Sequence, residues 1–106
     1  MPGKKSDPVK VERLVVILSA ELPDATVTWR QKGRFGDVEF LIQREDGEKN
    51  ILFLSEAWFR DDQYGPAERA WAIHKAAQRL RYHPGENYLL ELCCTELRHY
   101  EPDESN

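Results

Sequence analysis

The fold of this chain is decided by one stretch, Val38-Glu39-Phe40-Leu41-Ile42-Gln43-Arg44-Glu45-Asp46-Gly47-Glu48-Lys49-Asn50-Ile51-Leu52-Phe53. Asp46-Gly47 favours a two-residue turn, because such a turn needs positive φ angles, which Asp and Gly tolerate. A turn of that length pairs Glu45 with Glu48, Ile42 with Ile51, Leu41 with Leu52 and Phe40 with Phe53. A slip of one residue would separate these matched pairs, so the pattern predicts an antiparallel hairpin in this register.

Amphipathic helices are predicted on both sides of the hairpin. The first covers residues 8–22, with Asp7 as its cap and Pro8 in its first turn. Its apolar stripe is Val11, Leu14, Val15, Leu18 and Leu22. The second covers residues 66–82 and is stopped by His83-Pro84-Gly85. Its apolar stripe is Ala70, Ile73, Ala77 and Leu80. Both stripes follow the spacing of a helix that packs one face on a core.

Two other segments complete the expected elements. Residues 26–31 alternate, with Val27 and Trp29 on one face, which is typical of a strand. Residues 87–100 fit two periods. Leu89, Leu90, Cys93, Leu97 and Tyr100 share one side of a helix, whereas Tyr88, Leu90, Leu92 and Cys94 alternate as in a strand. We predict a helix here because Leu and Glu are good helix formers, with a fourth strand as the alternative.

The element order is therefore α-β-β-β-α-α, which indicates an α+β fold. Strands joined by short turns favour a three-stranded antiparallel sheet with the helices on one face. The 106 residues, 41% of them hydrophobic, suit a single domain with one core. We expect flexible ends at about residues 1–6 and 101–106.

Composition and charge narrow the classes of partner and location. The net charge of −4 weakens a role in binding duplex nucleic acid, which requires clustered positive charge. The apolar run Val15-Val16-Ile17-Leu18 is too short for a secretory signal or a membrane span, so we expect a soluble cytoplasmic protein without membrane association. Cys93 and Cys94 are adjacent, which disfavours a bond between them.

Catalytic and metal-binding motifs are missing from the sequence. It contains no Gly-x-Ser-x-Gly elbow and no Gly-rich phosphate loop. His74, His83 and His99 do not form a His-x-x-x-His pair, and Asp61-Asp62 lacks the spacing of a calcium loop. We therefore expect no enzymatic activity, no cofactor and no metal.

Surplus aromatic residues suggest a binding surface. Trp58, Phe59 and Tyr64 lie in the connection 55–65, and Trp71 and Tyr82 lie beside the apolar stripe of the second helix. Large aromatics outside a core stripe are typical of partner surfaces. The leading hypothesis is a small non-catalytic domain for protein interaction or regulation. A competing interpretation is that the C-terminal segment covers the flank of the second helix, which would leave only Trp58 and Phe59 for a partner.

An alternative function is nucleic-acid binding through a basic loop and the second helix. The residues concerned are Arg30, Lys32, Arg34, Lys75 and Arg79. Phe35 lies among the basic residues of the loop, as aromatics do on surfaces that bind single strands. A homodimer is a further expectation, since the first or third strand could form an open sheet edge.

Overall fold

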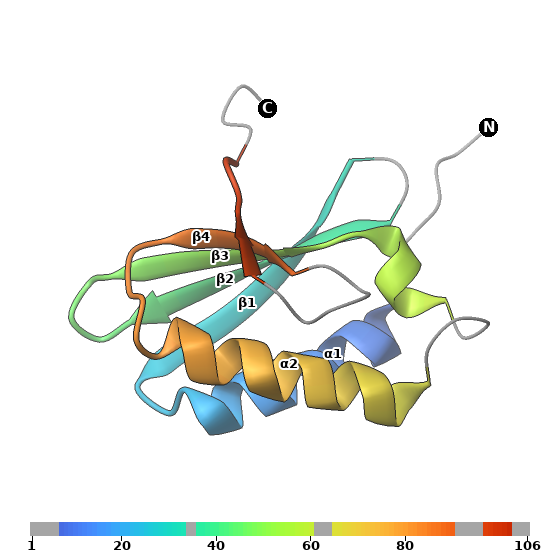
Figure 1. Cartoon of the computed structure of the whole chain (residues 1–106), viewed down its shortest axis with the longest axis horizontal. Helices are drawn as coiled ribbons and strands as arrows, with labels where there is room; N and C mark the ends of the chain where they lie inside the picture. The colour runs from blue at the N-terminus through green and yellow to red at the C-terminus, as the bar shows by residue number, and fades with distance from the viewer. Residues whose placement is uncertain (1–6, 34–35, 61–64, 91–96, 103–106) are drawn as a thin grey trace.

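The computed structural model describes residues 7–33, 36–60, 65–90 and 97–102. Two helices lie side by side on one face of a sheet of five strands (Figure 1). This arrangement confirms the α+β class with the helices on one face. In chain order the elements are α1 Pro8–Glu21, β1 Ala25–Lys32, β2 Asp37–Arg44, β3 Lys49–Leu54, the short 3-10 helix η1 Glu56–Phe59, α2 Pro66–Leu80, β4 Asn87–Leu90 and β5 Leu97–His99.

The sheet is larger than the predicted one and is mixed. Its strands are ordered β1-β2-β3-β4-β5, and every pair is antiparallel except β3 with β4. Two parallel neighbouring strands need a long connection that crosses the sheet. Between β3 and β4 this connection contains α2. Of the two strands suggested as edges, β1 is an edge, whereas β3 is interior.

The helix predicted for residues 87–100 is wrong. This part of the chain contributes β4 and β5, so the strand alternative was closer, although it gave one strand instead of two. Leu90 is fully buried, and β4 completes the hydrogen bonding of β3 through the pairs of Ile51 with Asn87 and Phe53 with Leu89. Pairing with the free edge of β3 therefore outweighs the helix propensity of Leu and Glu, because helix propensity is a weak local preference.

The hairpin forms, but its register is one residue away from the prediction. The Arg44 N–H donates to the Glu48 carbonyl at 2.8 Å and the Gly47 N–H donates to the Arg44 carbonyl at 3.0 Å, which closes a three-residue loop. Only Gly47 needs a positive φ, of 93°, whereas the predicted turn would also place Asp46 in that region. As a result Phe40 pairs with Leu52, and Ile51 moves to the opposite face from the core.

Both helices form, with small corrections to their ends and faces. The stripe of α1 is confirmed, with Val11, Leu14, Leu18 and Leu22 buried and Val15 packed against them. Helix α2 ends at Leu80 rather than Tyr82, and Ala70 is only half-buried. Its buried residues are Arg69, Ala72, Ile73, Ala76, Ala77 and Leu80. The buried side of α2 therefore includes Ala72 and Ala76 in place of the predicted Ala70. These small side chains let α2 lie close to the core.

A buried amide joins the hairpin to the end of α2. The side chain of Asn50 is fully buried, and its Oδ1 accepts from the Arg44 guanidinium at 3.1 and 3.2 Å. Its Nδ2 donates to the carbonyls of His83 at 2.9 Å and Glu86 at 2.6 Å. Arg44 also donates to the Leu80 carbonyl at 2.5 Å. Backbone groups of the turn between α2 and β4 are thus satisfied by two side chains of the hairpin.

A second polar cluster holds the C-terminal segment on the sheet face away from the helices. One oxygen of Glu39 accepts from Arg30 at 2.7 and 2.8 Å, and the other accepts from the Tyr100 hydroxyl at 2.5 Å. The Tyr100 ring stacks on Phe53 with their centroids 4.9 Å apart. Burial raises the pKa of Glu39, but the hydrogen bonds from Tyr100 and Arg30, with the charges of Arg30 and Lys32, more than offset this and hold it below its usual value.

We expect Asn50→Asp to lower the free energy of unfolding by about 3 kcal/mol at neutral pH, because two buried carbonyls lose their donor and face a carboxylate. Asn87→Asp is the matched control. Asn87 uses only its Oδ1, which accepts from the Ile51 N–H at 2.9 Å and is kept by Asp. Urea denaturation of both variants measures the difference. Equal losses in the two variants would show that the Asn50 donors are unimportant.

We expect Glu39→Gln to destabilise the fold by about 1 kcal/mol near neutral pH. Because the folded pKa lies below the ordinary value of 4.5, ionised Glu39 stabilises the fold above that value. This stabilisation is lost as the pH falls through the lowered pKa. The gap between variant and parent should therefore shrink between about pH 7 and about pH 3. Glu45→Gln, in the exposed hairpin loop, should match the parent at both pH values. A gap for Glu39→Gln that ignores pH would contradict the assignment.

Candidate functional site

The outer face of α2 carries a stripe of exposed large side chains. Trp71, Lys75 and Gln78 are spaced as residues on one side of a helix, and Tyr82 follows in the turn after the helix. Trp71 is 56% exposed and Tyr82 is 75% exposed. Arg79 is exposed beside them. We call Trp71, Lys75, Gln78, Arg79 and Tyr82 the α2 stripe.

The fold positions this stripe through contacts at its border. Glu21, at the end of α1, lies 2.6 Å from the Nδ1 atom of His74 and 3.2 Å from the Arg81 guanidinium. Arg81 also donates to the Glu21 carbonyl at 2.6 Å. The Tyr82 N–H donates to the Arg79 carbonyl at 3.1 Å. These contacts fix α2 against α1 and leave the α2 stripe facing solvent.

The α2 stripe combines aromatic and cationic groups. The Lys75 ammonium lies 6.0 Å from the centroid of the Trp71 ring, which is the range of a cation–π contact. Lys75 and Arg79 form no ion pair with any residue that the structure describes. The stripe therefore offers apolar area and the positive charges of Lys75 and Arg79, with the exposed Glu68 on the same side of the helix, on a chain whose net charge is −4.

The residues of the predicted aromatic surface differ in their exposure. Trp58, on η1, is 1% exposed, and its Nε1 donates to the Leu90 carbonyl at 3.0 Å. Phe59 is buried as well, so the expectation that Trp58 and Phe59 are available to a partner is wrong. Trp58 and Phe59 follow closely after the buried end of β3 at Leu54, and this closeness is a sequence signal of core packing. Treating residues 55–65 only as a connection missed that signal. Tyr64 lies outside the described residues.

The alternative basic set is divided between two faces. Lys75 and Arg79 belong to the α2 stripe, whereas Arg30 and Lys32 lie on β1 and alternate with its core-facing residues. Arg30 is therefore on the sheet face opposite the helices, where it is paired with Glu39. Arg34 lies outside the described residues. The structure does not bring these cations together into one surface.

The open sheet face holds a shallow cavity of about 260 Å³. Thr28, Leu41 and Ile51 line it, together with the paired Arg30 and Glu39. The charged groups of this cavity are already engaged with each other, so it is a weaker candidate than the α2 stripe.

Groups suited to acid–base or metal chemistry are also scattered. Burial and a hydrogen bond to Glu86 raise the pKa of Tyr88 from its ordinary value of 10.0 to about 12, which moves this phenol further from acid–base work at neutral pH. Among residues 7–33, 36–60, 65–90 and 97–102, no three His, Cys, Asp or Glu side chains are placed to hold a metal ion. Asp61, Asp62, Cys93 and Cys94 lie outside these ranges.

Comparisons with known proteins add no assignment to this site. None of the helices in the described part of the chain has the length and apolar character needed to cross a membrane. Protein-family models, curated proteins and solved structures give no match to the chain.

Proposed function

We propose that this protein is a non-catalytic interaction domain that binds an acidic segment of a partner protein through the α2 stripe. The observation that carries the proposal is the exposure of Trp71 on α2 and of Tyr82 in the turn that follows the helix. The two other tryptophans have partners inside the protein. Trp58 is buried in the core, and the Trp29 indole donates to Glu12 at 2.8 Å.

Exposed aromatic side chains of this size favour binding. A Trp or Tyr can bury about 150–250 Å² in an interface and loses little side-chain entropy when it does so. Trp, Tyr and Arg are the residues that most often dominate binding energy at protein interfaces. Trp71 and Arg79, exposed on α2, and Tyr82, exposed in the turn after it, supply all three types.

Charge complementarity indicates the chemistry of the partner. Lys75 and Arg79 give the α2 stripe a local positive charge, although the protein as a whole is acidic. An acidic segment with apolar side chains would pair with these cations and cover the indole of Trp71. Two cations on an acidic protein are few for a nucleic-acid surface, which usually neutralises several phosphates.

We expect selection of a random peptide library on the purified protein to enrich acidic peptides that also contain apolar residues. Trp71→Ser should weaken binding of these peptides at least tenfold, measured by calorimetry, because an aromatic interface anchor contributes roughly 2 kcal/mol or more. Lys75→Glu should also weaken binding of these peptides, because the new carboxylate repels the acidic peptide. Binding should also fall as the salt concentration rises.

Val16→Ser is the matched control, since Val16 is 67% exposed on α1, away from the α2 stripe. It should bind the peptides as the parent does. Equal binding by Trp71→Ser, or enrichment of peptides that are not acidic, would refute the proposal. Titration of single-stranded RNA and DNA forms the second arm. Tight binding there that depends on Trp71 would assign the surface to nucleic acid instead.

A further inference from the structure

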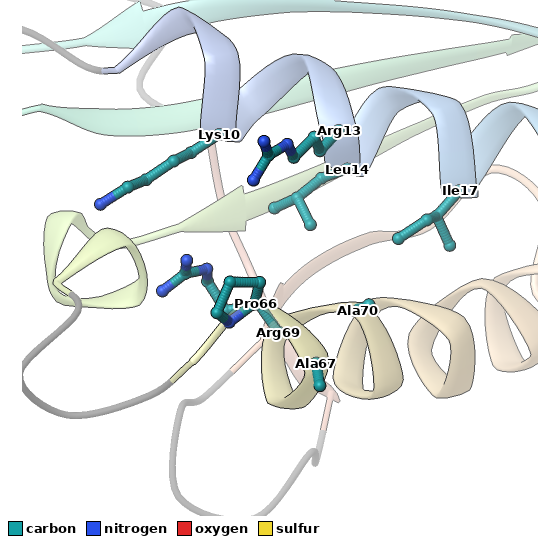
Figure 2. Close-up of a pocket in the computed structure, with 8 residues that line it drawn as sticks. All are labelled: Lys10, Arg13, Leu14, Ile17, Pro66, Ala67, Arg69 and Ala70. Atoms are coloured by element: carbon teal, nitrogen blue, oxygen red, sulfur yellow. The ribbon is translucent and has the colours of Figure 1, made fainter.

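A cavity of about 330 Å³ lies between the beginnings of the two helices. Figure 2 shows that α1 forms one wall and the first turns of α2 form the other. Lys10 and Arg69 line this cavity, but Lys10 donates to the Phe59 carbonyl at 2.7 Å, and both residues take part in other interactions within the protein. Their charges are therefore already engaged, and the edge of the sheet at β1 is the stronger candidate for a further surface.

The outer edge of β1 has no neighbouring strand in the described part of the chain. β1 is eight residues long and is bordered by β2 on one side only (Figure 1). It pairs with β2 without interruption from Ala25 to Lys32, and this strand contains no proline, glycine or bulge. β5, at the other edge of the sheet, has only three residues. A long and regular edge such as that of β1 offers its main-chain groups to another strand.

A hydrogen bond at the start of β1 shows which of its residues turn their main-chain groups outward. The Glu45 N–H donates to the Asp24 carbonyl at 3.1 Å, so Asp24 faces the strand β2. This direction alternates from one residue to the next along an antiparallel pair. The N–H and carbonyl groups of Val27 and Trp29 therefore point away from β2, and no described residue bonds to them.

The side chains of the same two residues are incompletely covered. Val27 and Trp29 are half-buried and pack against the buried residues of the core. The Trp29 indole also donates to Glu12 of α1 at 2.8 Å, which holds the ring beside the edge. A strand added at this edge would cover the remaining apolar surface of both residues and gain free energy in proportion to the area covered.

A second copy of β1 matches these groups in one register. With Thr28 on a two-fold axis, Val27 meets the partner's Trp29, and Trp29 meets the partner's Val27. Moving the axis to Val27 would bring Trp29 against the partner's Ala25, whose N–H is already bonded within the protein. Moving the axis to Trp29 would place Val27 opposite the partner's Gln31, which gives it no apolar cover. The register centred on Thr28 therefore satisfies both residues at once.

We propose that two copies of this chain associate through β1, paired antiparallel with Thr28 on the two-fold axis. The two five-stranded sheets then form one continuous sheet. Val27 and the partner's Trp29 exchange main-chain hydrogen bonds and cover each other's apolar surface, and the axis repeats this contact. The interface uses no residue of the α2 stripe, so it is tested independently of the proposed binding of an acidic segment.

The charges along the two copies agree with this register. Asp24 is exposed just before β1, and its side chain makes no hydrogen bond or ion pair with a described residue. It lies opposite the partner's Lys32, whose charge also acts on Glu39, so this attraction adds to the pairing without being required for it. Arg30 lies opposite the partner's Thr26, so no like charges meet across the axis.

Sedimentation equilibrium combined with amide hydrogen exchange tests the proposal. We expect a reversible change from the mass of one chain to that of two at roughly 10–100 µM protein, because one strand from each copy makes a small interface. The amides of Val27 and Trp29 should exchange at least tenfold more slowly in the dimer than in the monomer. A dimer that leaves these two amides unprotected would overturn the proposal. A protein that stays monomeric up to about 1 mM would also overturn it and would leave the edge to a strand of another protein.

Charge changes at Thr28 test the register. Thr28 is exposed and lies opposite its own copy in the proposed pairing. Thr28→Lys and Thr28→Glu should each weaken association roughly tenfold, because like charges then face each other across the axis. A mixture of the two variants should associate more tightly than either variant alone, and a mixture that does not would refute the register. Gln43→Lys is the matched control, since Gln43 is exposed on β2, and it should associate as the parent does.

A proline at position 27 tests the main-chain hydrogen bonds. Val27→Pro removes an N–H that points away from β2, a position where an edge strand tolerates proline, and it should weaken association at least tenfold. Val27→Ile keeps both the N–H and the apolar side chain and should associate as the parent does. Equal association of the two variants would contradict strand pairing. If Val27→Pro does not fold, the Thr28 variants decide the matter alone.

Discussion

The buried side chain of Asn50 is the constraint on which the arrangement of this protein depends. A buried amide must satisfy both its oxygen and its nitrogen, and the partners of Asn50 come from two distant parts of the chain, the Arg44 side chain and the carbonyls of His83 and Glu86. These contacts are possible only in the observed register of β2 and β3, in which Asn50 pairs with Ile42 on the core face. They also fix where the chain leaves α2 and enters β4. The parallel pairing of β4 with β3, and hence the mixed sheet, depends on that position.

The sequence predicted the elements better than it predicted their pairing. Both helices were found because their apolar spacing agrees with local signals, such as Asp7 and Pro8 at the start of α1. The hairpin was also found, but Asp46-Gly47 is compatible with a two-residue and a three-residue loop. The two-residue choice paired Ile42 with Ile51, whereas the structure pairs Ile42 with Asn50. Strands β4 and β5 were missed for a different reason. Their pairing depends on the free edge that β3 presents after the hairpin has formed, which periodicity within residues 87–100 does not report.

In the candidate site, too, the features that depend on one element were predicted, and those that depend on how the elements pack together were not. The position of Trp71 beside the apolar stripe was predicted correctly, because a residue's direction on a helix follows from its number. Its exposure was left open, since it depends on where the C-terminal segment packs. Trp58 was misjudged, because η1 turns it into the core and no helical or strand period covers so short an element. The described residues of the basic set do not lie together, because Arg30 and Lys75 are on elements whose exposed sides face opposite directions. Their separation follows from the layering of helices and sheet, which no local pattern contains.

Alanine in α2 connects the core to the α2 stripe and to the cavity between the helices. Ala72, Ala76 and Ala77 bring the helix close to the core, so large side chains have no room on that side. The bulky side chain of Trp71 consequently lies on the exposed side of the helix. Toward α1, Ala67 and Ala70 are too short to fill the space opposite Leu14, and the cavity between the helices remains. The alanine content of α2 thus explains three properties of the helix. Its core side is closely packed, its outer side carries an exposed aromatic residue, and its side toward α1 borders a cavity. Larger side chains at the alanines facing α1 would close the cavity without altering the α2 stripe.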